Sequence, residues 1–91
     1  MAWASTRILL AHANHELLHQ RSEGALEDLL LAIQRELDNP PLSEQERPRQ
    51  WRRVAQMHEG RARILQRIGR REEAAEAARL GREYRQRAAG Q

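Results

Sequence analysis

The segment from Trp51 to Ala88 carries the strongest pattern in the chain, because residues suited to the packed face of a helix recur at helical spacing on both sides of Gly69. Before the glycine these residues are Trp51, Val54, Ala55, His58, Ala62, Leu65 and Ile68. After it they are mostly small: Ala74, Ala77, Ala78, Gly81, Tyr84 and Ala88. Steps of three and four residues place each set on one face of an α-helix. Gly69 lies where a helix C-cap glycine is expected, so the pattern predicts a helical hairpin that turns at 68–71.

The first half of the chain predicts two further helices. Apolar residues at helical spacing indicate one helix over about 3–21 and a second over about 22–37, with Ser22 as its N-cap. The second helix must end before Pro40 and Pro41, because proline lacks a backbone donor and bars the residue before it from helical geometry. A short turn then leads to the main helix of the second half, which we expect to begin at Pro48.

We therefore expect an all-α fold of four helices in two antiparallel hairpins, since no segment alternates as a strand would. The chain forms one domain, 1–91, with hairpins over about 3–38 and 48–88 and a proline-bearing connection over about 39–47. The hairpins could close as a four-helix bundle or stack side by side. The expected core is Leu10, Ala13, Leu17, Leu29, Ile33, Trp51, Val54, Leu65, Ile68, Ala74 and Ala78.

The composition argues against several classes of protein. The chain has no cysteine, so disulfide, zinc-thiolate and thiol-nucleophile chemistry are excluded. No apolar run approaches the roughly 20 residues of a membrane span, so we expect no membrane partner. The first residues lack the basic and long apolar regions of a signal peptide. We expect a cytoplasmic protein that is not an enzyme.

Charge divides the chain into an acidic and a basic half. Residues 1–46 hold three arginines and eight acids, 3 − 8 = −5, and residues 47–91 hold thirteen arginines and five acids, 13 − 5 = +8. All sixteen basic residues are arginine. Codon bias explains this choice most simply, whereas bidentate recognition of carboxylates or phosphates is the functional explanation. The two halves could attract each other within one molecule or between two, so a homodimer is one expectation.

A repeated order of small and large residues links the two predicted hairpins. The residues are Ala13, Ala25, Leu29 and Ala32 in the first, and Ala62, Ala74, Ala78 and Gly81 in the second. Each is displaced by 49 positions, as in 62 − 13 = 49. This order resembles the tetratricopeptide repeat, a helical hairpin with small residues at these spacings. The sequence departs from the family at Ala78, where a large residue is usual.

The resemblance implies a TPR-like protein–protein interaction module whose concave face docks a peptide or helix from another protein. Four arginines of the second half would then suit an acidic partner. They are Arg61, Arg63, Arg67 and Arg70. This docking role is the leading functional hypothesis.

Three of the four histidines form a separate candidate site. His15 and His19 flank Glu16 in an HExxH spacing, which in zinc peptidases places two imidazoles one helical turn apart. His12 lies one turn earlier and is the third candidate ligand. The metzincin extension would need a glycine at Ser22 and a ligand at Ala25, and neither is present, whereas Glu36 is a conceivable third ligand of the gluzincin kind. Because the sequence also predicts no strand, we favour solvated or packing histidines and expect no cofactor, with zinc as the alternative. The residues around His15 also resemble the H-box of sensor histidine kinases, although the residues that follow differ.

The basic second half raises a nucleic-acid alternative. Its last helix carries Arg71, Arg79, Arg82, Arg85 and Arg87, which could contact phosphates. Four acids interleave with them at helical spacing: Glu72, Glu73, Glu76 and Glu83. That arrangement is typical of a solvated, ion-paired helix face. Nucleic-acid binding is therefore the less favoured hypothesis.

Overall fold

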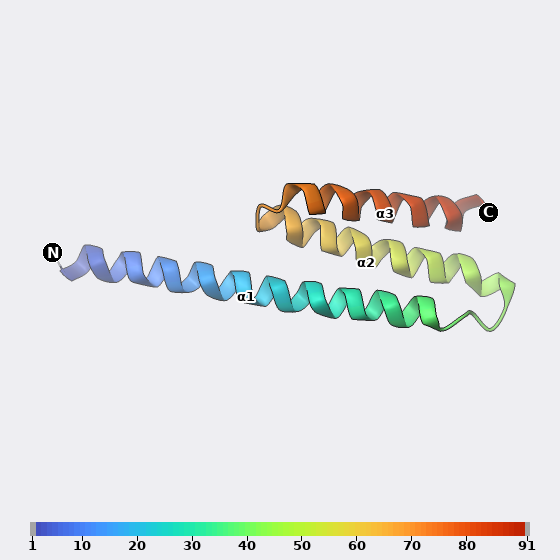
Figure 1. Ribbon diagram of the computed structural model, residues 1–91, viewed down its shortest axis with the longest axis horizontal. Helices are drawn as coiled ribbons and strands as arrows, with labels where there is room; N and C mark the ends of the chain where they lie inside the picture. Colours follow the sequence, from blue (N-terminus) through green and yellow to red (C-terminus); the bar gives the residue numbers. More distant parts are fainter. Residues whose placement is uncertain (1, 91) are drawn as a thin grey trace.

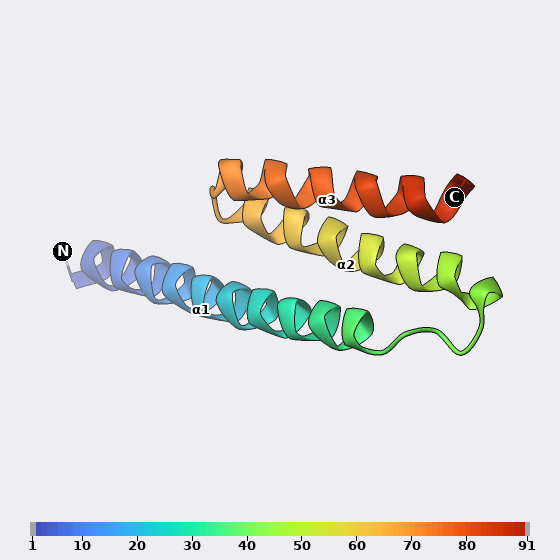
Figure 2. The same ribbon diagram turned by 45° about the vertical axis from the view of Figure 1, so that its right-hand side comes forward.

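The computed structural model describes the backbone of residues 2–90 and the side chains of residues 18–90. The described chain folds into α1 (Ala2–Asp38), a 3-10 turn η1 (Glu44–Glu46), α2 (Arg47–Arg67) and α3 (Arg71–Gly90). The chain reverses direction after α1 and again after α2, so α2 is antiparallel to both of the other helices (Figure 1). α2 and α3 form a close hairpin, and α1 packs along α2, as both ribbon views show (Figure 2).

The all-α prediction is confirmed for residues 2–90, which contain no strand, but the prediction of four helices is wrong. α1 runs unbroken for 37 residues through the expected boundary at Ser22. A turn there would need a residue that leaves helical geometry, and the only positive φ among the described residues is at Gly69. Ser22 is buried on the packed side of α1, and Gly24 costs only about 1 kcal/mol in helix propensity. The hairpin over 3–38 and the four-helix bundle therefore do not form.

The predicted turn between α2 and α3 is present and is closed by glycine. Gly69 has φ = 82°, a conformation that a side chain disfavours. The backbone N–H of Gly69 donates to the carbonyl of Gln66 at 3.2 Å, and that of Arg70 donates to the carbonyl of Leu65 at 2.9 Å. These two bonds form a Schellman motif, which satisfies carbonyls that the end of α2 leaves without partners.

All three helices contribute to the core. Leu26 of α1 joins Leu65 of α2 and Ala74 and Ala77 of α3 in one buried cluster. At Gly81 an added Cβ would lie only 3.1 Å from the Cγ of Glu59, so the glycine allows α3 to approach α2 closely.

The expected core is only partly the observed one. Four of its members are buried: Ile33, Val54, Leu65 and Ala74. Four are half-buried: Leu29, Trp51, Ile68 and Ala78. The remaining three, Leu10, Ala13 and Leu17, lie outside the described side chains. The buried side of α1 is therefore known over its second half, where it packs against α2.

A buried glutamine fastens the end of α1 to the start of α2. Gln50 is 3% exposed, and its Nε2 donates to the backbone carbonyls of Glu36 at 2.7 Å and Asn39 at 3.0 Å. The carbonyl of Glu36 belongs to the last turn of α1, which lacks intrahelical donors, and Asn39 directly follows the helix. α2 begins at Arg47, one residue before the expected start, with Pro48 in its first turn. The proline-bearing connection is thus held in place by a side chain from the helix that follows it.

Candidate partner-docking groove

Several arginines of α2 and α3 are already paired with carboxylates of the same chain. These pairs are Arg53 with Glu36, Arg85 with Glu59, and Arg79 with both Glu76 and Glu83. The hydrogen bonds from Arg85 hold the pKa of the Glu59 carboxyl below its ordinary value. Charges that are neutralised in this way attract an outside partner only weakly, so the unpaired arginines decide where an acidic ligand would bind.

An arginine-edged groove lies between α2 and α3 next to their turn. It encloses about 660 Å³ and is open to solvent. Its lining residues are Ala62, Arg63, Gln66, Arg67, Arg71, Ala74, Ala75 and Ala78. No acid lines it, and within residues 18–90 the ion pairs involve other arginines. The groove therefore combines an alanine floor with three exposed guanidinium groups.

Two of the four predicted partner-binding arginines lie in this groove. Arg63 and Arg67 are exposed at its edge, whereas Arg61 and Arg70 are turned to other contacts. Arg71 completes the edge and was missed, because it belongs to α3 and reaches Arg67 only through the geometry of the Gly69 turn. The four-residue step from Arg67 to Arg71 was visible in the sequence, but it spans a turn, where helical spacing does not apply.

Arg70 instead joins the turn to α1. Its Nη1 donates to Glu23 Oε1 at 2.6 Å, and its Nη2 lies 2.6 Å from Glu73 Oε2. Glu23 belongs to α1 and Glu73 to α3, so one guanidinium links the end of the α2–α3 hairpin to the long helix. Binding an outside carboxylate through Arg70 would require these contacts to break.

Arg61 takes part in a half-buried cluster with His58 and Tyr84. Arg61 Nη1 lies 3.1 Å from His58 Nδ1, and the His58 ring stacks on Tyr84 with centroids 5.6 Å apart. Because arginine can only donate, this bond requires Nδ1 to be unprotonated. Arg61 Nε is buried without a partner among the described residues. Burial, together with the nearby Arg61 charge, lowers the pKa of His58 from its ordinary 6.5.

His58 is expected to make the fold sensitive to mild acid. With its folded pKa below 6.5, the unfolded chain binds the proton first as the pH falls. The stability that neutral His58 contributes is complete above pH 6.5 and is lost as the pH drops from there to the folded pKa. Urea unfolding between pH 8 and pH 4.5 measures this loss. We expect His58→Gln to lack that part of the pH dependence and His19→Gln, at an exposed position, to retain it; equal curves for the wild type and His58→Gln would contradict the assignment.

Of the three histidines proposed as zinc ligands, only His19 has a side chain that the structure describes. His19 is exposed, and its Nε2 lies 3.7 Å from Glu23 Oε1, the carboxylate that also accepts from Arg70. His12 and His15 fall outside the described side chains. Within the described side chains, no three potential ligands come together as a metal site.

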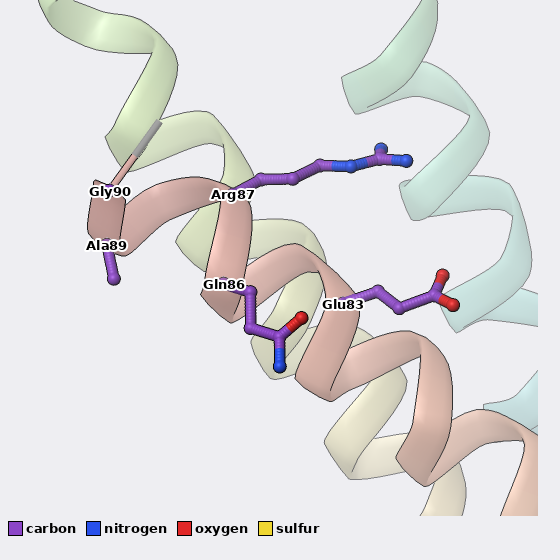
Figure 3. Close-up of a pocket in the computed structure, with 5 residues that line it drawn as sticks. All are labelled: Glu83, Gln86, Arg87, Ala89 and Gly90. Atoms are coloured by element: carbon purple, nitrogen blue, oxygen red, sulfur yellow. The ribbon is translucent and has the colours of Figure 1, made fainter.

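A second hollow lies at the far end of α3 and has a different character. It encloses about 690 Å³ and is lined by Glu83, Gln86, Arg87, Ala89 and Gly90. Figure 3 shows Glu83 and Arg87 extending to one side of α3, with Gln86 and Ala89 directed elsewhere. Arg87 lies over the rings of Trp51 and Tyr84, with its Cζ 5.6 and 4.9 Å from their centroids. Opposite charges and no continuous apolar floor make this hollow a poorer docking site.

Comparison of the chain with protein-family models, with curated proteins and with solved structures gave no match. In the part of the chain that the structure describes, no helix has a stretch long and apolar enough to cross a membrane.

Proposed function

We propose that this protein is a non-catalytic docking module that binds an acidic peptide or helix of another protein in the groove between α2 and α3. The observation that carries the proposal is the groove edge formed by Arg63, Arg67 and Arg71 above a floor of alanines. Small floor residues let a partner backbone approach closely, and planar guanidinium groups bind carboxylates in bidentate fashion.

The proposal keeps the docking role that the tetratricopeptide resemblance implies, without its second complete hairpin. Three residues of the repeated pattern, Ala62, Ala74 and Ala78, belong to the groove floor. Because their side chains are small, the surface between the two helices is hollowed at these positions and forms the groove. An acidic helix with a narrow apolar stripe fits this chemistry better than a basic or strongly apolar one.

The test is binding of a labelled amphipathic peptide made of glutamate, alanine and leucine, with its lysine counterpart as the comparison. Arg63→Gln, Arg67→Gln and Arg71→Gln combined should weaken binding of the acidic peptide about tenfold or more at low salt, since three charge contacts are lost. A matched variant with Arg49→Gln, Arg52→Gln and Arg82→Gln removes the same charge from exposed positions outside the groove. It should change affinity by about twofold or less.

The same two triple variants also separate the nucleic-acid alternative. Single-stranded RNA bound through diffuse phosphate contacts should be weakened similarly by both variants, with a steep salt dependence. That outcome, with no selective effect on the glutamate peptide, would replace the docking proposal. Equal affinity for the glutamate and lysine peptides would also overturn the docking proposal, because the groove would then not distinguish acidic from basic ligands.

A further inference from the structure

α1 keeps large apolar side chains partly in water, some of them beside the strip of residues that packs against α2. Leu18, Leu30, Leu31 and Leu37 are 47, 45, 47 and 41% exposed. Leu30 and Leu37 are seven residues apart, so they lie two turns apart on one face of the helix. Each follows a buried residue, Leu26 or Ile33, by four positions, so this face borders the side that packs against α2. His19, which is also exposed, is five turns from Leu37 and shares that face. Leu18 and Leu31 project from other sides of α1. An exposed apolar edge such as that of Leu30 and Leu37 marks a candidate protein interface.

α1 is also longer than the hairpin that covers it. At 1.5 Å per residue its 37 residues extend about 55 Å, whereas the 21 residues of α2 extend about 31 Å. The N-terminal half of α1 continues past the turn between α2 and α3 (Figure 1). The sequence of this half is rich in apolar residues, among them Ile8, Leu9 and Leu10. The radius of gyration, 18.0 Å, exceeds the roughly 12 Å expected of a compact chain of this length.

The charges of α1 differ between its two halves. Residues 2–21 carry two arginines and one acid, 2 − 1 = +1, and residues 22–38 carry one arginine and five acids, 1 − 5 = −4. Antiparallel pairing of two α1 helices would set each +1 half beside a −4 half. Parallel pairing would set the two −4 halves together, which like-charge repulsion disfavours.

We propose that the occupant of this face is a second copy of the chain, and that two α1 helices pair antiparallel about a two-fold axis near residue 20. The N-terminal half of each α1 then covers Leu30 and Leu37 of the other copy. The resulting interface is isologous, as in most homodimers. This proposal goes beyond the docking role and uses a different surface, since none of these leucines lines the α2–α3 groove.

The first test is the mass in solution. Sedimentation equilibrium should give twice the 10.6 kDa of the chain, and Leu30→Glu with Leu37→Glu should raise the dimer Kd about 100-fold or more, because charges would enter the apolar interface. Leu42→Glu is the matched control, because Leu42 is 97% exposed in the connection after α1. Circular dichroism of both variants verifies that the helices remain formed. A wild-type chain that stays monomeric at high micromolar concentration would overturn the proposal.

The second test reads the direction of pairing. The chain has no cysteine, so single cysteines report proximity without interference. His19→Cys lies near the proposed axis and should form a disulfide with its own copy. The two copies of Gln34→Cys should not, because antiparallel pairing about residue 20 separates them by about 28 residues of helix, roughly 42 Å. A disulfide at position 34 without one at position 19 would show parallel pairing and refute the arrangement.

Different variants test the docking proposal and the dimer proposal. The groove variant with Arg63, Arg67 and Arg71 changed to glutamine should remain dimeric, and the Leu30→Glu, Leu37→Glu variant should still bind the glutamate peptide. Loss of dimerisation in the groove variant would show that the arginines serve the contact between copies, and would contradict the α1 interface.

Discussion

Leu65→Ala is expected to lower the free energy of unfolding by about 3–5 kcal/mol, near the upper end for loss of a buried leucine. Leu65 is 1% exposed and is one of the two largest fully buried side chains among the described residues. Its neighbours in the core cluster include Ala74 and Ala77, whose small side chains cannot move in to fill the space. For a domain with about 5–10 kcal/mol in total, this substitution removes roughly half of the stability.

Urea unfolding followed by circular dichroism measures the effect of Leu65→Ala. Leu65→Met, which keeps the volume, should cost less than about 1.5 kcal/mol and separates lost packing from altered backbone. Leu42→Ala, at a position that is 97% exposed, should leave the midpoint unchanged. An alanine variant that unfolds at the wild-type midpoint would show that the cluster around Leu65 is not the centre of the core.

Local sequence signals predicted the second half of the fold because the turn there needs a positive φ, which glycine adopts more readily than other residues. Gly69 ends α2 with positive φ, and the helical spacing on either side then determines the faces that meet. The first half offered a weaker signal. Ser22 is a good N-cap, but the same residue is tolerated inside a helix when its side is buried, as it is here. A residue that favours a helix start does not create one by itself. A residue before it must also end the preceding helix, and none does so before Ser22.

The candidate groove depends on contacts that sequence spacing does not determine. Arg70 and Arg71 are neighbours in the chain, yet Arg70 binds Glu23 of α1 and Arg71 lines the groove. The turn at Gly69 sets the orientation of α3, and α1 lies beside that turn, so the two neighbouring arginines meet different surroundings. The sequence could therefore point to Arg63 and Arg67, which line the candidate groove. It could not show which of the other arginines pair with carboxylates 26 or 47 positions away.

Gln50→Glu is expected to destabilise the fold by about 3 kcal/mol at neutral pH, although the two side chains have nearly the same shape. In the native chain Gln50 Nε2 donates to the backbone carbonyls of Glu36, in the last turn of α1, and of Asn39, just after the helix. A carboxylate cannot donate to them, and it would be buried beside the partial negative charge of a helix C-terminus. Gln56→Glu, at an exposed position of the same helix, is the matched control and should change stability by less than about 0.5 kcal/mol.

The pH dependence of Gln50→Glu distinguishes this cause from simple loss of packing. The buried carboxyl should have a folded pKa above its unfolded value of about 4.3, because the charged form is disfavoured in the fold. Its destabilisation is then complete above the folded pKa and diminishes as the pH falls toward the unfolded one, where the protonated acid can donate one bond again. The difference in unfolding free energy from the wild type, measured between pH 7 and pH 4, should therefore shrink with acid. A difference that stays constant over that range would mean that the junction of α1 and α2 does not depend on these two hydrogen bonds.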